Sequence, residues 1–245
     1  MSLNIFFIIG AQRSGTSYLR QVLDEHPQIE MAKPFRPEPK FFMNEVSPED
    51  KANYLNTYFS KEAQWNKILG EKSTSYLESV VAAKGIRQLF PQAKILVCLR
   101  NPVERAISNY YYSYSNGLET RTLEEVFLQN VPAPVVSGVS VSPFDYVKRG
   151  EYVNYLKIYD SYFKEGLVKV LLFEELMGNL SAIQSVYSFL GAEAGFVPKS
   201  LDQKINEGVN KLEIPPKLVE LLKAHYRPYN QELMNAYGID TGIWN

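Results

Sequence analysis

The most constraining feature of the sequence is an apolar run that leads into a loop bounded by two glycines. Residues 4–9 are almost continuously apolar, as in a strand buried on both faces of a parallel sheet. Gly10 and Gly15 bound the loop that follows, and apolar residues between positions 18 and 23 then share one helical face. Glycines permit the close backbone approach that a phosphate group needs, and amides at a helix start point toward the anion. This strand–loop–helix unit therefore predicts an anion-binding loop.

The loop departs from the nucleoside-triphosphate P-loop at two places. Its glycine spacing is the same, but the P-loop continues with Lys and then Ser or Thr, whereas Thr16 stands where that lysine is expected and Arg13 supplies the positive charge. P-loop enzymes also hold magnesium through an acidic residue on another core strand, and the matching strand here is followed by Arg100. Both departures argue against a magnesium-dependent phosphotransferase. A glycine turn that merely joins a strand to a helix is the alternative.

Short apolar runs alternate with helical periods along the chain, which is the pattern of an α/β protein. We expect a single domain over residues 1–245, a three-layer P-loop-like fold with a central, mainly parallel sheet flanked by helices. Strands are predicted at residues 4–9, 28–31, 68–71, 94–99 and 168–173. Helices are predicted to follow the glycine loop, at 80–89, from Pro102, and at 151–164, 180–190 and 216–236, with a loop over 132–143.

Composition excludes several classes of protein. With 45% apolar residues the chain is not intrinsically disordered, and a formal net charge of -1 argues against a nucleic-acid partner bound through a basic field. Cys98 is the single cysteine, and two histidines leave little for a zinc site, so no metal is expected. The apolar run at residues 5–9 is far shorter than a membrane span, so no span is expected and a cytoplasmic location is favoured.

A second candidate anion site follows the strand predicted at 94–99. Arg100 stands at the strand end, Asn101 can cap the next helix, and Pro102 suits its first position. Arg105 and Ser108 are three residues apart and so share a helix face. An arginine fork and a serine hydroxyl can together bind a phosphate group. The alternative is a surface arginine beside an unrelated helix serine.

Together the two motifs resemble those of sulfotransferases that use 3′-phosphoadenosine 5′-phosphosulfate (PAPS). Gln12-Arg13-Ser14-Gly15-Thr16-Ser17 is similar to their 5′-phosphosulfate loop, and the segment from Arg100 to Ser108 is similar to their 3′-phosphate motif. Segments 70–76, 148–152 and 173–176 also resemble segments of this family. Within the family, the chain is most similar to the heparan-sulfate and bacterial carbohydrate branch. The resemblance implies a PAPS donor, adenosine 3′,5′-bisphosphate (PAP) as product and no metal. It assigns nucleotide binding to Gln12, Arg13, Ser14, Gly15, Thr16, Ser17, Arg100 and Ser108.

The resemblance also implies three catalytic residues. Arg13, in place of the more frequent lysine, and Lys72 would stabilise charge on the leaving nucleotide, and Glu38 would be the general base for the acceptor. His26 is the rival base. The alternatives are that Glu38 is a surface carboxylate paired with Lys40 or Arg36, and that Lys72 is a solvated lysine beside Glu71.

The remaining expectations concern the adenosine side and the acceptor. Asn206 and Gly208 occupy roughly the place of a basic nucleotide clamp in the carbohydrate branch, although the basic residues are missing. The tyrosine run at 110–114 lines a pocket or, alternatively, packs. The expected function is sulfuryl transfer to a hydroxyl or amine, with a carbohydrate acceptor favoured over a lipid, a polyketide or a small alcohol. An atypical P-loop kinase or an inactive nucleotide-binding relative would also fit the glycine loop, and the oligomeric state is left open.

Overall fold

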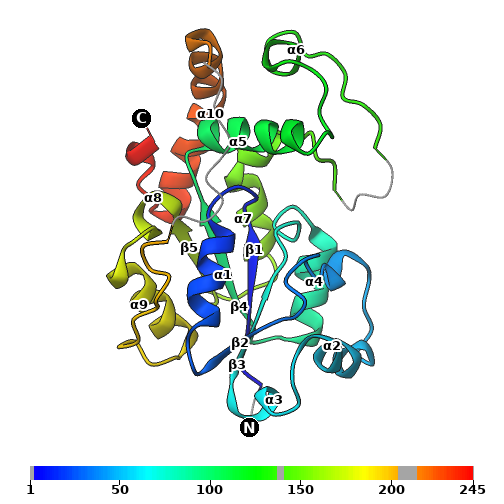
Figure 1. Cartoon of the computed structure of the whole chain (residues 1–245), viewed down its shortest axis with the longest axis vertical. Coiled ribbons are helices and arrows are strands. Elements are labelled where there is room, and N and C mark those ends of the chain that lie inside the picture. The colour runs from blue at the N-terminus through cyan, green and yellow to red at the C-terminus, as the bar shows by residue number, and fades with distance from the viewer. Residues whose placement is uncertain (1–2, 137–140, 204–213, 245) are drawn as a thin grey trace. The chain divides into compact units, whose positions relative to one another are not determined.

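The protein is built on one parallel sheet. The computed structural model describes residues 3–136, 141–203 and 214–244. Within these residues, five strands pair in the order β2-β3-β1-β4-β5, and every neighbouring pair is parallel (Figure 1). The strands are β1 (Ile5–Gly10), β2 (Ile29–Met31), β3 (Ile68–Lys72), β4 (Lys94–Leu99) and β5 (Val168–Leu172). All residues of β1 and nearly all of β4 are buried, as their apolar sequences require.

The chain divides into two compact units. The sheet unit comprises Met1–Leu99 and Tyr155–Ile205 and contains all five of these strands. The helical unit comprises Arg100–Asn154 and Asn206–Asn245. The division falls directly after the last residue of β4, so Arg100 is the first residue of the helical unit.

One face of the sheet is covered by helices α1 (Thr16–Asp24), α8 (Phe173–Leu176) and α9 (Leu180–Leu190). Successive side chains of a strand point to opposite faces, and this face receives alternate residues of the two central strands. They form one core with the apolar sides of α1 and α9: Phe6, Ile8, Leu96, Cys98, Leu19, Val22, Ile183, Val186 and Leu190.

The opposite face packs against an aromatic cluster. It is contributed by the 3-10 helix η1 (Phe41–Met43), by α2 (Asp50–Tyr58) and by the residue after α4 (Val80–Leu89). The ring of Phe7 on β1 lies 5.5 Å from that of Phe42 and 6.0 Å from that of Phe90, measured between centroids. A short helix, α3 (Ala63–Asn66), precedes β3. With helices on both faces, the sheet unit has the three-layer α/β/α architecture that the sequence predicts.

The helical unit has its own apolar core. Its helices are α5 (Pro102–Ser115), α6 (Leu123–Phe127), α10 (Pro216–Tyr237) and the 3-10 helices η2 (Lys148–Gly150) and η3 (Thr241–Trp244). Helix α7 (Tyr152–Asp160) begins in this unit and ends in the sheet unit. The core joins α5 to α10 through Val103, Ala106, Ile107, Tyr110, Leu218, Leu222 and Tyr226. No described helix is both long enough and apolar enough to cross a membrane.

Candidate functional site

The loop between β1 and α1 has the backbone of an anion-binding turn. Arg13 has φ 66° and Gly15 has φ 79°, so two residues of this short loop adopt the left-handed conformation. Left-handed residues of this kind occur in anion-binding nests, where successive backbone amides point toward one site. Ser14 between them is fully buried, and its Oγ atom has no hydrogen-bond partner among the residues that the structure describes. A buried hydroxyl without a partner is costly unless a ligand satisfies it.

Gly15 is required both by its backbone and by its neighbour. A Cβ atom at this position would lie 2.5 Å from the ring of Phe173 at the start of α8. Gly15 also caps the N-terminus of α1, which begins at Thr16. The Phe173 ring therefore leaves space for glycine but not for a Cβ atom at the N-terminus of α1, where the helix dipole favours a negative charge.

Lys72 connects this loop to Glu38. It is the last residue of β3, and its ammonium Nζ lies 2.8 Å from Oε1 of Glu38 and 3.5 Å from Oγ of Ser17. The Lys72 and Glu38 side chains are only 13% and 17% exposed. Lys72 is therefore not a solvated lysine, and Glu38 is not a surface carboxylate, because the two form a largely buried ion pair with each other.

Thr74 completes the binding of the Glu38 carboxylate. Its backbone amide donates to Oε2 at 3.0 Å, and its hydroxyl lies 3.1 Å from the same oxygen. Glu38 is thus held by three donors from one segment, the lysine ammonium and the amide and hydroxyl of Thr74. Thr74 belongs to the segment 70–76, in which the sequence alone indicates a role only for Lys72.

The residue before Lys72 on β3 is a fully buried carboxylate. Glu71 accepts a hydrogen bond from the hydroxyl of Tyr54 at 2.6 Å and another from that of Ser73 at 2.7 Å. Burial raises the pKa of the Glu71 carboxyl above its ordinary value, although hydrogen bonds from Tyr54, Ser73 and Tyr76 act in the opposite direction. Burial of the Tyr54 and Tyr76 hydroxyl groups raises their pKa well above the ordinary value for tyrosine, and the nearby charge of Glu71 raises it further. No motif in the sequence indicates a role for Glu71 or Ser73.

His26, the rival base, is a structural residue. It is 1% exposed, and its Nδ1 accepts a hydrogen bond from the amide of Gln28 at 3.1 Å. Nε2 must then carry the proton, which it donates to the carbonyl of Glu193 at 3.0 Å. Both ring nitrogens are occupied within the fold, so the imidazole has no position left for an acceptor proton.

In the helical unit, Arg100 directly follows the carboxyl end of β4. Asn101 caps α5 by accepting from the amides of Val103 and Glu104, as the sequence predicts. The guanidinium of Arg100 pairs with Glu104 at 2.6 Å, and Ser108 is half-buried in the second turn of α5. Arg100 retains 17% exposure of its side chain, whereas Glu104 retains 54%. An incoming anion can therefore displace the weakly held Glu104 carboxylate.

Arg105, which by its spacing shares a face of α5 with Ser108, is bonded within the helical unit. It is fully buried and donates to Asn109 Oδ1 at 3.2 Å and to the carbonyl oxygen of Tyr146. Its charge ties α5 to the segment before η2. Tyr110 likewise packs in the core of this unit, and its hydroxyl donates to the carbonyl of Arg121.

The last two predicted nucleotide-binding residues, Asn206 and Gly208, lie outside the described residues. Within residues 3–136, 141–203 and 214–244, no group of three or more His, Cys, Asp or Glu side chains could hold a metal ion.

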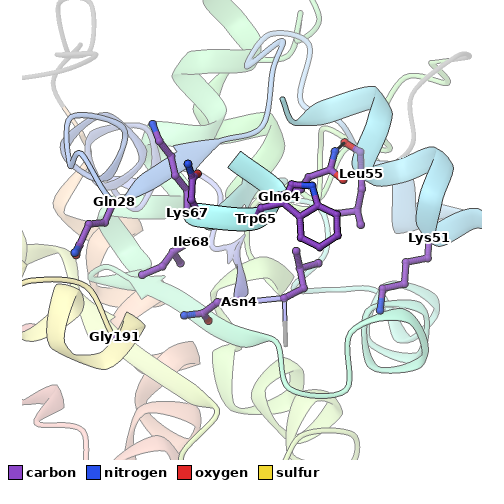
Figure 2. A pocket seen from close by; sticks show the side chains of 11 residues that line it. Asn4, Gln28, Lys51, Leu55, Gln64, Trp65, Lys67, Ile68 and Gly191 are labelled. Atoms are coloured by element: carbon purple, nitrogen blue, oxygen red, sulfur yellow. Dashed lines mark hydrogen bonds between the residues drawn. The ribbon is translucent and has the colours of Figure 1, made fainter. Parts of the chain in front are cut away.

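A hollow of about 460 Å³ lies elsewhere, at the amino ends of the strands (Figure 2). Its lining includes Asn4 before β1, Gln28 before β2 and Lys67 before β3, with Trp65 beside them. The glycine loop and Lys72 stand at the carboxyl ends of β1 and β3. Because none of the predicted site residues lines the hollow, the candidate site is the cluster at the carboxyl ends.

Within the sheet unit, the cluster combines three chemical capabilities. The loop at Gln12–Ser17 can receive an anion, the Lys72 ammonium can stabilise negative charge beside it, and the Glu38 carboxylate can accept a proton. The ammonium lies between the other two elements, within 3.5 Å of both. This arrangement suits the transfer of an anionic group to an acceptor that loses a proton.

Comparison with known protein families agrees with this chemistry. A family model described as the sulfotransferase domain matches residues 4–212. The human bifunctional heparan sulfate N-deacetylase/N-sulfotransferase 2 is 27% identical over 192 residues, which are 76% of this chain and 22% of that protein. The mouse heparan sulfate glucosamine 3-O-sulfotransferase 6 is 25% identical over 259 residues, covering 96% of this chain and 72% of that protein. The chain thus spans about a fifth of the first relative's length and most of the second's.

Solved structures show the same fold. A sulfotransferase from Alicyclobacillus acidocaldarius superimposes with a TM-score of 0.75 at 28% sequence identity, covering 100% of this chain and 99% of that one. The mouse sulfotransferase SULT7A1, crystallised in complex with PAP, superimposes with a TM-score of 0.53 at 15% identity, covering 98% of this chain and 86% of that one. At 15% identity the second similarity concerns the fold alone.

Proposed function

Since this chain belongs to the sulfotransferase family, we propose that it transfers the sulfuryl group of PAPS to a hydroxyl or amine of a carbohydrate acceptor. The observation that carries the proposal is the position of Lys72, whose ammonium lies 2.8 Å from the Glu38 carboxylate and 3.5 Å from Ser17 of the anion-binding loop. The carbohydrate acceptor is supported by relatives whose names specify heparan sulfate.

On the donor side, the residues from Gln12 to Ser17 hold the 5′-phosphosulfate. The left-handed backbone at Arg13 and Gly15 and the unpartnered Ser14 hydroxyl suit an anion of this size and charge. Negative charge grows on the bridging oxygen as its bond to sulfur breaks. Arg13 and Lys72 stabilise that charge, and a cation fixed near the bond stabilises the transition state more than the bound donor.

In the helical unit, Arg100 and Ser108 bind the 3′-phosphate. This phosphate carries a charge of about -1.5 to -2 at neutral pH. A unit charge pair at about 4 Å contributes about 4 kcal/mol at an effective dielectric constant near 20, before desolvation. The attraction between a guanidinium and the phosphate is therefore larger than the stabilisation that a helix N-terminus gives to a negative charge, which is about 0.3–1 kcal/mol.

On the acceptor side, Glu38 is the general base. A bond forms between the acceptor oxygen or nitrogen and sulfur, and the bond from sulfur to the bridging oxygen breaks. The acceptor proton passes to Glu38, and the nucleotide leaves as PAP. An ionised carboxylate held by Lys72 and Thr74 is fixed in place before the acceptor arrives, which favours a productive geometry.

The test of the donor site is the thermal shift that PAP produces in the absence of magnesium. Arg13→Ala and Arg100→Ala are each expected to weaken PAP binding by about tenfold or more, equivalent to about 1.4 kcal/mol. Lys84→Ala in the sheet unit and Arg227→Ala in the helical unit are matched controls, because each removes one exposed positive charge. No shift at high PAP concentration, or a shift equally reduced by the controls, contradicts the proposed donor.

The test of the catalytic assignment is transfer of radiolabelled sulfate to a panel of glycans, lipids and small alcohols. Glu38→Gln is expected to keep the PAP-induced shift and to lose transfer. Transfer by the parent to lipids or alcohols but to no glycan refutes the carbohydrate assignment. PAP binding with no transfer to any acceptor indicates an inactive relative, and magnesium-dependent ATP turnover indicates a kinase.

A further inference from the structure

The segment that carries Glu38 is held from one side by a hydroxyl group that is bonded to a buried carboxylate. The hydroxyl of Ser73 donates to Glu71 Oε1 at 2.7 Å and accepts from the backbone amide of Lys40 at 3.0 Å. A hydroxyl has one proton and accepts through its lone pairs. Donation to Glu71 therefore fixes the Ser73 proton and leaves its lone pairs directed at Lys40, two residues after Glu38.

A second hydroxyl holds the same bend. The hydroxyl of Tyr76 accepts from the backbone amide of Phe42 at 3.1 Å. Both amides belong to the tight bend after Glu38, where Lys40 has φ 51° and caps η1. Glu71 thus sets the orientation of one of these two acceptors, the hydroxyl of Ser73.

Alternate residues of the segment 71–74 hold Glu38 in two different ways. Lys72 and Thr74 bind the carboxylate of Glu38 itself. Glu71 is fully buried, and together with Ser73 it holds the backbone that follows Glu38. Glu71 accepts hydrogen bonds from the hydroxyl groups of Tyr54 and Ser73, and Ser73 bonds the backbone at Lys40. The effect of Glu71 on the reaction therefore passes through Ser73 to the Glu38 segment.

We propose that Glu71 is a positioning residue for the general base, acting through Ser73 on the bend that follows Glu38. This inference rests on the proposed role of Glu38. Glu71→Gln replaces one acceptor oxygen with an amide N–H, which confronts a hydroxyl that already donates there. Where the N–H stands in place of Oε1, the Ser73 hydroxyl must turn, and its hold on the Lys40 amide weakens. A displacement of about 1 Å in a catalytic group can cost about a hundredfold in rate.

The experiment measures sulfate transfer by three variants, each with a single substitution. Glu71→Gln and Ser73→Ala are each expected to lower kcat by about tenfold to a hundredfold, with the KM for PAPS and the PAP-induced thermal shift unchanged. Tyr54→Phe is the matched control, because its hydroxyl bonds the same carboxylate at 2.6 Å without a hydrogen bond to the bend at Lys40 and Phe42. Its kcat is expected to stay within about twofold of the parent value, while its melting temperature falls.

Amide hydrogen exchange supplies a readout that does not depend on turnover. Peptides covering residues 39–43 are expected to exchange faster in Glu71→Gln and in Ser73→Ala than in the parent or in Tyr54→Phe. If Glu71→Gln does not fold, the comparison of Ser73→Ala with Tyr54→Phe decides. Equal losses of kcat in those two variants, or unchanged exchange at 39–43, overturn the inference.

Glu38→Gln, measured beside them, separates the two proposals. Parent-like transfer by Glu38→Gln refutes the assignment of Glu38 as the base. Loss of transfer in Glu38→Gln together with parent-like kcat in Glu71→Gln and Ser73→Ala refutes only the positioning role of Glu71.

Discussion

Neutralising Lys72 and Glu38 one at a time and together measures how strongly the two charges depend on each other. Lys72→Met keeps the length of the aliphatic chain and removes the ammonium. Glu38→Gln keeps the shape of the carboxyl group, removes its charge and still offers one oxygen to the amide of Thr74. Each single variant leaves one charge unpaired in a place where the partners are only 13% and 17% exposed, whereas the double variant leaves none.

The size of the effect follows from the separation and the burial. Two unit charges 2.8 Å apart attract by about 6 kcal/mol at an effective dielectric constant near 20, before desolvation is subtracted. Breaking a fully buried pair costs about 3–5 kcal/mol, and an exposed pair contributes about 0–1 kcal/mol. We therefore expect each single variant to lose about 2 kcal/mol of stability. The double variant should lose about 2–2.5 kcal/mol, which gives a coupling energy of about 1.5–2 kcal/mol.

Thermal unfolding without ligand measures these values, and each single variant is expected to melt about 4–8 °C below the parent. Arg20 and Asp24 provide the matched control, an ion pair at 3.1 Å with 13% and 33% exposure on α1. The corresponding cycle with Arg20→Met and Asp24→Asn should give about 0.3–0.5 kcal/mol. A Lys72–Glu38 coupling no larger than that of Arg20–Asp24 refutes the argument that burial strengthens this pair.

Three further outcomes are expected. Gly15→Ala should lower stability by about 1–3 kcal/mol and weaken PAP binding, because its Cβ would lie 2.5 Å from the Phe173 ring in a left-handed conformation; an unchanged melting temperature contradicts this. His26→Gln should lower the melting temperature but leave the kcat of the folded enzyme at the parent level, since both ring nitrogens bond within the fold; a large drop in kcat would restore His26 as a base. Burial raises the pKa of the Cys98 thiol to about 12, so a thiol reagent at pH 8 should modify it only after denaturation, and rapid labelling of the native protein refutes its burial.

The sheet is predictable from the sequence because its strands are continuous apolar runs that alternate with helical periods. The strand predicted at 94–99 has those bounds, and the strand predicted at 4–9 is displaced by one residue at each end. Helices with clear signals are also predictable: α5 begins at Pro102 after its Asn101 cap, and α9 has its predicted bounds. The shortest helices are not. Helix α3 has four residues and α2 has a single fully buried side chain, Tyr54, so neither shows a helical period strong enough to recognise.

The contacts of the residues around Glu38 could not be predicted from the sequence. Its pairing with Lys72 joins positions far apart in the chain, and nothing local distinguishes Lys72 from Lys40 as the partner. The burial of Glu71 is equally hidden, because a carboxylate beside a lysine in a polar segment resembles a surface position. Arg105 shows a related limit: spacing fixes which residues share a helix face, but not whether that face meets a ligand or the core, and Arg105 is fully buried.

The position of Lys72 also accounts for the missing P-loop lysine. Thr16 takes the place of that lysine at the start of α1, yet the anion-binding loop is not without an ammonium, because β3 pairs with β1 and brings Nζ of Lys72 to 3.5 Å from Ser17. A lysine in the loop would serve the bound anion alone. A lysine on the neighbouring strand can also hold Glu38 at 2.8 Å, so one charge joins the proposed donor side to the proposed acceptor side. Moving the ammonium back into the loop, with Thr16→Lys and Lys72→Met together, should therefore preserve PAP binding while transfer is lost; restored transfer would show that the loop needs a cation but Glu38 does not need Lys72.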